Sequence, residues 1–137
     1  MVGGKDLGLS FNYSYNSPTE IVTSLSKLGF NAMSLASYHS YDKGIAGIRN
    51  AVQTVVDNKF IYAGVNDSEE NRLKNNIITK NGLKIALLSY TVGTDEIVQN
   101  PFAVFWMSTK DKTKVKNTPK PQRKIRTPAM KKFSVVL

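Results

Sequence analysis

The 137-residue sequence contains no cysteine and only one histidine, His39. Without cysteine, disulfides, thiolate zinc sites and cysteine nucleophiles are all excluded. The redox compartment stays open, because a cysteine-free chain is compatible with either environment. Long apolar runs are also missing: none approaches the roughly 18 residues that a membrane span needs. Residues 1–6 lack the apolar region of a signal peptide, so we expect neither a signal peptide nor a transmembrane segment in this chain.

Positive charge is abundant, but only at one end of the chain. Residues 1–109 contain nine basic and nine acidic residues, whereas residues 110–137 contain ten basic residues and one acidic residue. The whole net charge of +9 therefore belongs to the last 28 residues. Residues 108–132 have almost no large apolar side chains, so they cannot bury enough surface to offset the entropy of ordering them. We predict one α/β domain over residues 1–107 and a disordered basic tail over 108–137.

The sequence predicts a βαβ unit in the first half of the domain. Ser17-Pro18-Thr19-Glu20 resembles a capping box and predicts a helix over 18–28. A short apolar strand is expected over 30–36, followed by a helix over 44–57 with apolar residues at helical spacing. A second strand over 59–63 would complete the unit, with its two strands parallel.

The flanking segments have weaker or more local signals. The alternation of residues 9–15 is typical of an extended segment, although an ordered loop fits it equally well. A helical turn is expected within 66–73, capped by Asp67 or Ser68. Asn81-Gly82 between two β-rich runs predicts a hairpin of 75–79 with 83–90, and the apolar second run is expected inside the sheet.

The candidate site is the polar loop between the strand over 30–36 and the helix over 44–57. Polar loops at the carboxyl ends of strands are where open α/β sheets bind ligands. His39 is the only imidazole that could act as a base or metal ligand, and Asp42 follows three residues later. A loop histidine that only forms local hydrogen bonds is the competing interpretation. Gly44 opens a helix that could present N–H groups to an anion, and Gly93-Thr94-Asp95 could line the same crevice; an ordinary turn is the favoured explanation of both.

The loop and the segments around it resemble a known family. The run from Leu28 to Gly44 (LGFNAMSLASYHSYDKG), with Ile61-Tyr62-Ala63-Gly64 and the run from Asn81 to Thr94, is similar to the bacterial capsule-synthesis CapA family, the PgsA-type poly-γ-glutamate biosynthesis proteins. The resemblance covers about residues 9–100, and we expect the segment from about 108 to lie outside it.

This resemblance implies a metallophosphatase-like layered α/β sandwich with a two-metal centre to which His39 contributes. The implied cofactor is a divalent metal (Mn, Zn or Mg), with His39 and Asp42 as candidate catalytic residues. The family has asparagine where this chain has Tyr38, and tyrosine cannot supply an amide ligand. The family's early Gly-Asp strand and later histidine-rich loops have no counterpart here. We therefore expect a fragment of a capsule-synthesis protein without an intact two-metal hydrolase site, and whether it is an enzyme is left open.

The resemblance also implies an environment and partners. Its members work at the cell envelope or outside the cell, and the implied partner is an anionic polymer, either poly-γ-glutamate or capsular polysaccharide. A fragment would leave a sheet edge unpaired, which favours association with other chains. The alternative function is a small module that binds polyanions or nucleic acid through the basic tail.

Overall fold

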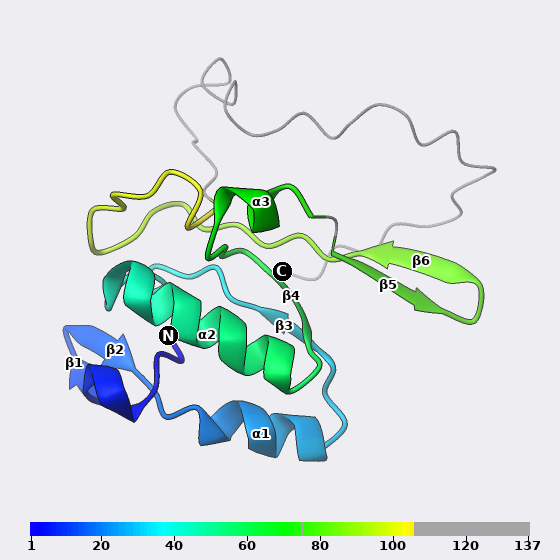
Figure 1. Cartoon of the computed structure of the whole chain (residues 1–137), viewed down its shortest axis with the longest axis horizontal. Coiled ribbons are helices and arrows are strands. Elements are labelled where there is room, and N and C mark those ends of the chain that lie inside the picture. Colours follow the sequence, from blue (N-terminus) through cyan, green and yellow to red (C-terminus); the bar gives the residue numbers. More distant parts are fainter. Residues whose placement is uncertain (75, 106–137) are drawn as a thin grey trace.

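The computed structural model describes residues 1–74 and 76–105, which form an α/β fold (Figure 1). The predictions for residues 106–137, including the basic tail, lie outside the described residues. Among the described residues, no helix has the length and apolar character that crossing a membrane requires. The elements follow in this order: the 3-10 helix η1 (Lys5–Leu7), β1 (Ser10–Asn12), β2 (Ser14–Asn16), α1 (Glu20–Lys27), β3 (Ala32–Ser34), α2 (Gly44–Asp57), β4 (Ile61–Ala63), α3 (Glu69–Arg72), β5 (Ile77–Lys80) and β6 (Leu83–Ala86).

The predicted βαβ unit is confirmed and forms the centre of the molecule. Strands β3 and β4 pair in parallel, with Met33 opposite Tyr62, and α2 connects them. The apolar spacing of α2 gives it one buried face, formed by Ile48, Val52 and Val55 among others. Val22 of α1 and Val55 of α2 are fully buried and pack in one cluster with the buried Phe60. Burying each such side chain stabilises the fold by about 1.5–3 kcal/mol.

Helix α1 is confirmed, but its predicted capping box is wrong. The helix begins at Glu20 with Thr19 as the N-cap, and no side chain caps it. The reason lies in the preceding backbone. Ser17 donates its N–H to the Met1 carbonyl and accepts from the Gly4 N–H, so it pairs with the N-terminal segment instead of capping the helix. The predicted turn over 66–73 contains α3, whose Ser68 side chain accepts from the Asn71 N–H as a cap should.

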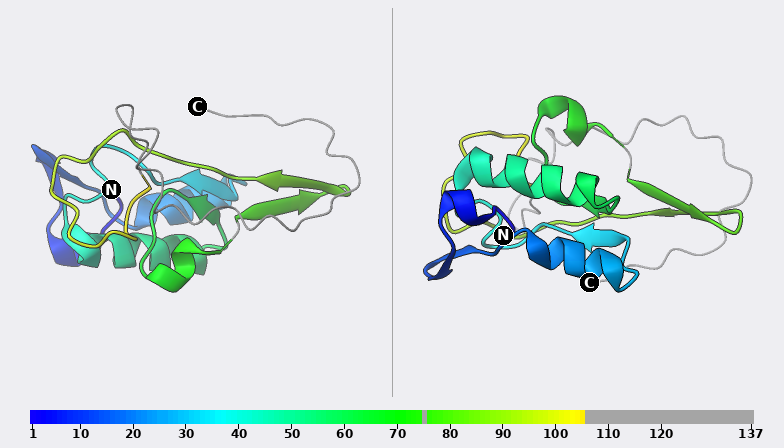
Figure 2. Two further views of the ribbon diagram at one scale, coloured as in Figure 1. Left: turned by 90° about the horizontal axis from the view of Figure 1, so that it is seen from above. Right: turned by 60° about the horizontal axis from the view of Figure 1, so that its bottom comes forward.

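Two antiparallel hairpins accompany the βαβ unit. Strands β1 and β2 turn at Tyr13, so the alternating segment folds back on itself instead of forming one extended strand. Strands β5 and β6 turn at Asn81 and Gly82, both with positive φ, as the Asn-Gly pair predicts. Figure 2 shows this second hairpin extending away from the helices.

The expectation that residues 83–90 lie inside the sheet is wrong. Strand β6 ends at Ala86 and is exposed along its whole length. It pairs only with β5, because the tight turn joins these two strands and neither reaches β3 or β4. The described strands therefore form three separate two-stranded sheets. The layered metallophosphatase-like sandwich remains a prediction.

The first of two core clusters lies beside the candidate loop. Tyr41 from that loop packs with Ile48 and Val52 of α2 and with Val65, Ala103 and Val104. Val65 and Val104 form an antiparallel bridge, and Phe105 donates its N–H to the Gly64 carbonyl. Residues 103–105 thus cover the continuation of β4 and close the core around the loop.

Candidate metal centre

The loop over residues 37–43 is held by its own serines and by a buried tyrosine. The Ser40 hydroxyl donates to the Leu35 carbonyl at 2.7 Å and accepts from the Ser37 N–H at 2.6 Å. Tyr41 is buried, and its hydroxyl donates to the Asn100 side chain at 2.9 Å. With Ser40 and Tyr41 fixed inward, His39 and Asp42 on either side of them are held in a defined geometry.

His39 and Asp42 form a hydrogen-bonded pair. His39 Nδ1 lies 3.0 Å from Asp42 Oδ2, and the Asp42 side chain is only 1% exposed. Asp42 Oδ2 also accepts the backbone N–H of Tyr15 at 2.7 Å. The other oxygen, Oδ1, is buried and has no hydrogen-bond partner within the described residues. An unpaired buried carboxylate oxygen is costly, so it marks a position where a cation would be favoured.

A third candidate ligand, Asp95, comes from a distant loop. The Asp95 N–H donates to the Tyr38 carbonyl at 2.9 Å, which brings residues 93–95 to the candidate loop. His39, Asp42 and the exposed Asp95 each offer a ligand atom, and these three atoms lie within 4.8 Å of one another. The suggestion that Gly93-Thr94-Asp95 lines the same crevice as His39 agrees with this contact.

This group of three fits a divalent cation. One imidazole nitrogen and two carboxylate oxygens are ligands used by Zn²⁺ and, for the oxygens, by Mg²⁺ and Mn²⁺. His39 Nδ1 lies 3.0 Å from Asp42 Oδ2, so this ring nitrogen and the carboxylate face the same point, which a cation could occupy in place of their hydrogen bond. Three protein ligands suit one ion with an open position.

The remaining predicted residues surround this group without joining it. Tyr38 is half-exposed and contacts the His39 ring edge-on, with centroids 5.3 Å apart. Gly44 begins α2 and donates its N–H to the Tyr41 carbonyl, so that donor is used within the loop. The Gly93 carbonyl accepts from the Thr91 hydroxyl, and Thr94 bonds to the Glu96 carbonyl.

Two residues at this site, Asp95 and Tyr15, were not predicted from the sequence to contribute to it. Asp95 was singled out as part of a turn but not as a ligand, although an acidic residue after Gly93-Thr94 was a usable signal. Tyr15 lies 27 residues before Asp42, and no local pattern could connect them.

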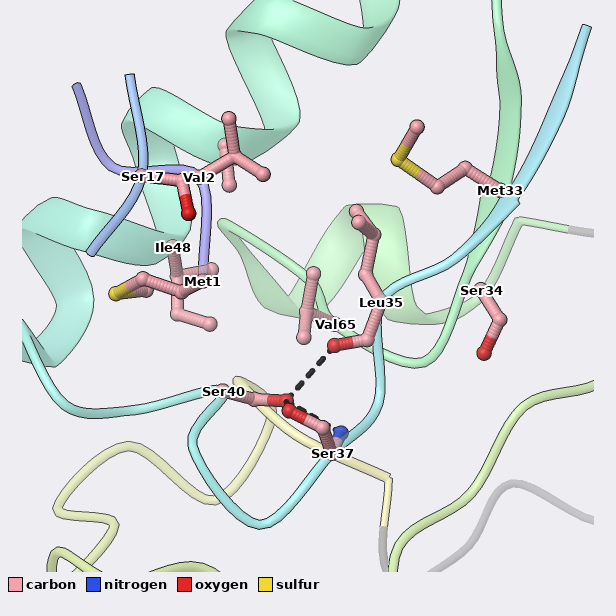
Figure 3. Close-up of a pocket in the computed structure, with 11 residues that line it drawn as sticks. Met1, Val2, Ser17, Met33, Ser34, Leu35, Ser37, Ser40, Ile48 and Val65 are labelled. Carbon is pink, nitrogen blue, oxygen red and sulfur yellow. Dashed lines mark hydrogen bonds between the residues drawn. The ribbon is translucent and has the colours of Figure 1, made fainter. Parts of the chain in front are cut away.

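A separate cavity of about 240 Å³ lies beside β3, next to Ser37 and Ser40 of the loop (Figure 3). Ser37 and Ser40 reach it from the loop, while Met33 and Leu35 reach it from β3 and the residue that follows it. His39, Asp42 and Asp95 are not part of its lining. The Ser37 and Ser40 hydroxyls bond to each other, and neither contacts the histidine, so they do not form a nucleophile–base pair.

Comparison with known proteins agrees with the resemblance. Searches of curated proteins and of solved structures gave no significant match. The family model described as "Bacterial capsule synthesis protein PGA_cap" matches residues 1–133. This match is longer than the expected residues 9–100, and it corrects the expectation that the segment from about 108 lies outside the resemblance. The chain belongs to the PGA_cap family of bacterial capsule synthesis proteins.

Proposed function

We propose that this chain acts in the assembly of an anionic capsule polymer, and that His39, Asp42 and Asp95 bind one divalent cation for that task. The observation that carries the proposal is that these three side chains, from two loops more than 50 residues apart in sequence, each offer a ligand atom within 4.8 Å of the other two. In addition, Asp42 Oδ1 is buried without a hydrogen-bond partner among the described residues. Family membership supports the capsule-related part. Poly-γ-glutamate or a capsular polysaccharide is the proposed polymer.

The three residues would have different tasks in such a site. Asp42 is buried and lies 3.0 Å from His39 Nδ1, so its carboxylate would share the ion with that ring nitrogen. His39 is about one-third exposed and Asp95 is exposed, which leaves their side of the site open to a large ligand. A cation bound there would neutralise acidic groups of the polymer or polarise one of its oxygens.

The proposed site differs from the two-metal centre that the resemblance implies. Two-metal catalysis uses several ligands to hold ions about 3.5–4 Å apart, whereas the described residues bring three ligands together. We propose single-ion binding and little hydrolase activity for this chain. A metallophosphatase-like arrangement of the fold is part of the proposal, supported by the βαβ unit that delivers a polar loop from β3.

Titration calorimetry with Mn²⁺ or Zn²⁺ tests the proposal. We expect one ion per chain, with affinity lowered more than about 10-fold by His39→Ala or Asp95→Asn. Glu96→Gln is the matched control, because it removes one negative charge from the residue next to Asp95 without altering the three ligands. Binding that the three variants weaken equally would overturn the site, and two ions per chain would overturn single-ion binding.

The alternative function is polyanion binding by the basic segment over 110–137, which the uneven charge distribution favours. Replacing its ten Lys and Arg residues by Gln should abolish salt-dependent binding to an acidic polymer or nucleic acid. If such binding persists in that variant, the alternative fails. Metal binding by His39, Asp42 and Asp95 should be the same in the unmodified protein and in this variant.

A further inference from the structure

The β1–β2 hairpin contacts the candidate metal centre through one residue, Tyr15. Its backbone N–H donates to Asp42 Oδ2 at 2.7 Å. Its ring lies against the His39 ring, with centroids 4.4 Å apart. One residue of β2 therefore holds both members of the His39–Asp42 pair, the aspartate through the backbone and the histidine through the side chain.

The register of the hairpin explains why this N–H is available. Tyr15 lies opposite Phe11 in the antiparallel pair. Its N–H goes to Asp42 and its carbonyl accepts from the Met1 nitrogen, so both of its backbone groups point away from β1. This is the arrangement of a non-hydrogen-bonded pair, in which neither residue contributes its N–H to the ladder. The bond to Asp42 can therefore be removed without removing a bond of the hairpin.

We propose that Tyr15 is a positioning residue for the metal centre. The inference rests on the proposed function, since it states how the ligands of that same site are oriented. By its N–H, Tyr15 keeps Asp42 Oδ2 turned toward β2 and toward His39 Nδ1, which leaves Oδ1 as the free oxygen. By its ring, it limits rotation of the imidazole and keeps Nδ1 directed to Asp42.

The chain offers a clean probe of this arrangement, because His39 is its only histidine. The ¹⁵N chemical shifts of one imidazole report whether the proton of the neutral ring is on Nδ1 or Nε2. With Asp42 held in place, the proton belongs on Nδ1, where the carboxylate accepts it. This measurement needs no metal, so it tests the positioning independently of metal binding.

The decisive variant replaces residue 15 by the α-hydroxy acid analogue of tyrosine, which exchanges the N–H for an ester oxygen and keeps the ring. The matched control is the analogous ester at Phe11, a residue that lies directly opposite Tyr15 in the hairpin and is 87% exposed. We expect the ester at 15 to lower the population of the Nδ1–H form and to weaken Mn²⁺ binding about 10-fold or more. The ester at 11 should change neither.

Side-chain variants of Tyr15 test the contact between its ring and the His39 ring. They also keep the proposal testable if the ester protein does not fold. Tyr15→Phe should retain both the tautomer and the metal affinity, whereas Tyr15→Ala keeps the N–H but should weaken metal binding several-fold. Equal effects of the two esters, or an unchanged tautomer in the ester at 15, would overturn the proposal. If the unmodified chain binds no Mn²⁺, the proposed function fails, and the tautomer alone decides the role of Tyr15.

Discussion

Gly64 shows how tightly the carboxyl ends of the two parallel strands approach each other. It follows β4 with φ +108°, and a Cβ added there would lie 2.5 Å from the backbone nitrogen of Ala36 and 2.6 Å from the Ser89 hydroxyl. Ala36 is the last residue before the candidate loop, and its N–H donates to the same Ser89 hydroxyl. The absence of a side chain at Gly64 therefore sets the point from which the loop with His39 and Asp42 departs.

Gly64→Ala should accordingly destabilise the protein by about 2–4 kcal/mol, from overpacking against backbone together with the strained φ. Urea denaturation measures the effect. Gly82→Ala is the matched control, because Gly82 also has a positive φ but has nothing within 4 Å of the added carbon. Equal losses in the two variants would mean that φ alone, and not the close approach to Ala36, explains Gly64.

Within the described residues, the hairpin β5–β6 has no buried residue. All four residues of β6 are exposed, and so are Ile77 and Lys80 of β5. A two-stranded hairpin without a packing partner is marginally stable in water. By contrast, α2 has five buried residues.

Hydrogen exchange should reveal this difference. The amides of residues 77–86 are expected to exchange through local opening, at a free energy well below that of global unfolding. Amides in the second half of α2 should exchange only through near-global unfolding. Similar protection of the two elements would contradict the structure, and would indicate that something covers the hairpin in solution.

Strand β4 contributes a pH-dependent element of stability through Tyr62. This side chain packs against both core clusters. Burial, with a smaller contribution from the negative charge of Asp67, raises the pKa of Tyr62 above its usual value of 10.0. The folded state thus favours the neutral phenol, and the resulting stability is complete below about pH 10 and is lost as the pH rises through the higher folded pKa.

The substitution Tyr62→Phe removes the ionisable phenol. As the pH rises above about 10, the free energy of unfolding of this variant should therefore fall less steeply than that of the unmodified protein. Urea denaturation at a series of pH values from 8 to 11 measures the two slopes. Tyr13→Phe is the control, because Tyr13 is 84% exposed at the tip of the first hairpin. Parallel curves for Tyr62→Phe and the unmodified protein would contradict the assigned burial effect.

Across the whole molecule, the sequence predicts what local patterns can encode. The apolar spacing of residues 45–56 and the Asn81-Gly82 turn were enough to predict α2, the βαβ unit and the second hairpin. The exposure of Leu83 and Ile85 was not predictable in this way, because an apolar run indicates burial only if a neighbouring layer exists to cover it.

The candidate centre was predictable in part for the same reason. His39 and Asp42 lie three residues apart in one loop, so the sequence alone predicted that they could act together. Asp95 and Tyr15 reach the site through the tertiary fold, by a hydrogen bond to Tyr38 and one to Asp42. Such long-range contacts leave no periodic trace in a single sequence, so the sequence alone did not indicate that Asp95 lies beside His39 and Asp42.

The central claim is that His39, Asp42 and Asp95 bind one divalent cation. Crystals grown with Zn²⁺ and measured on both sides of the zinc absorption edge test it most directly, since the anomalous difference map locates the ion without assumptions about its ligands. The account predicts one peak bounded by these three side chains, at about 2.0–2.2 Å from the nitrogen and oxygen ligands. A map with no peak there, or with zinc bound by other residues alone, would contradict it.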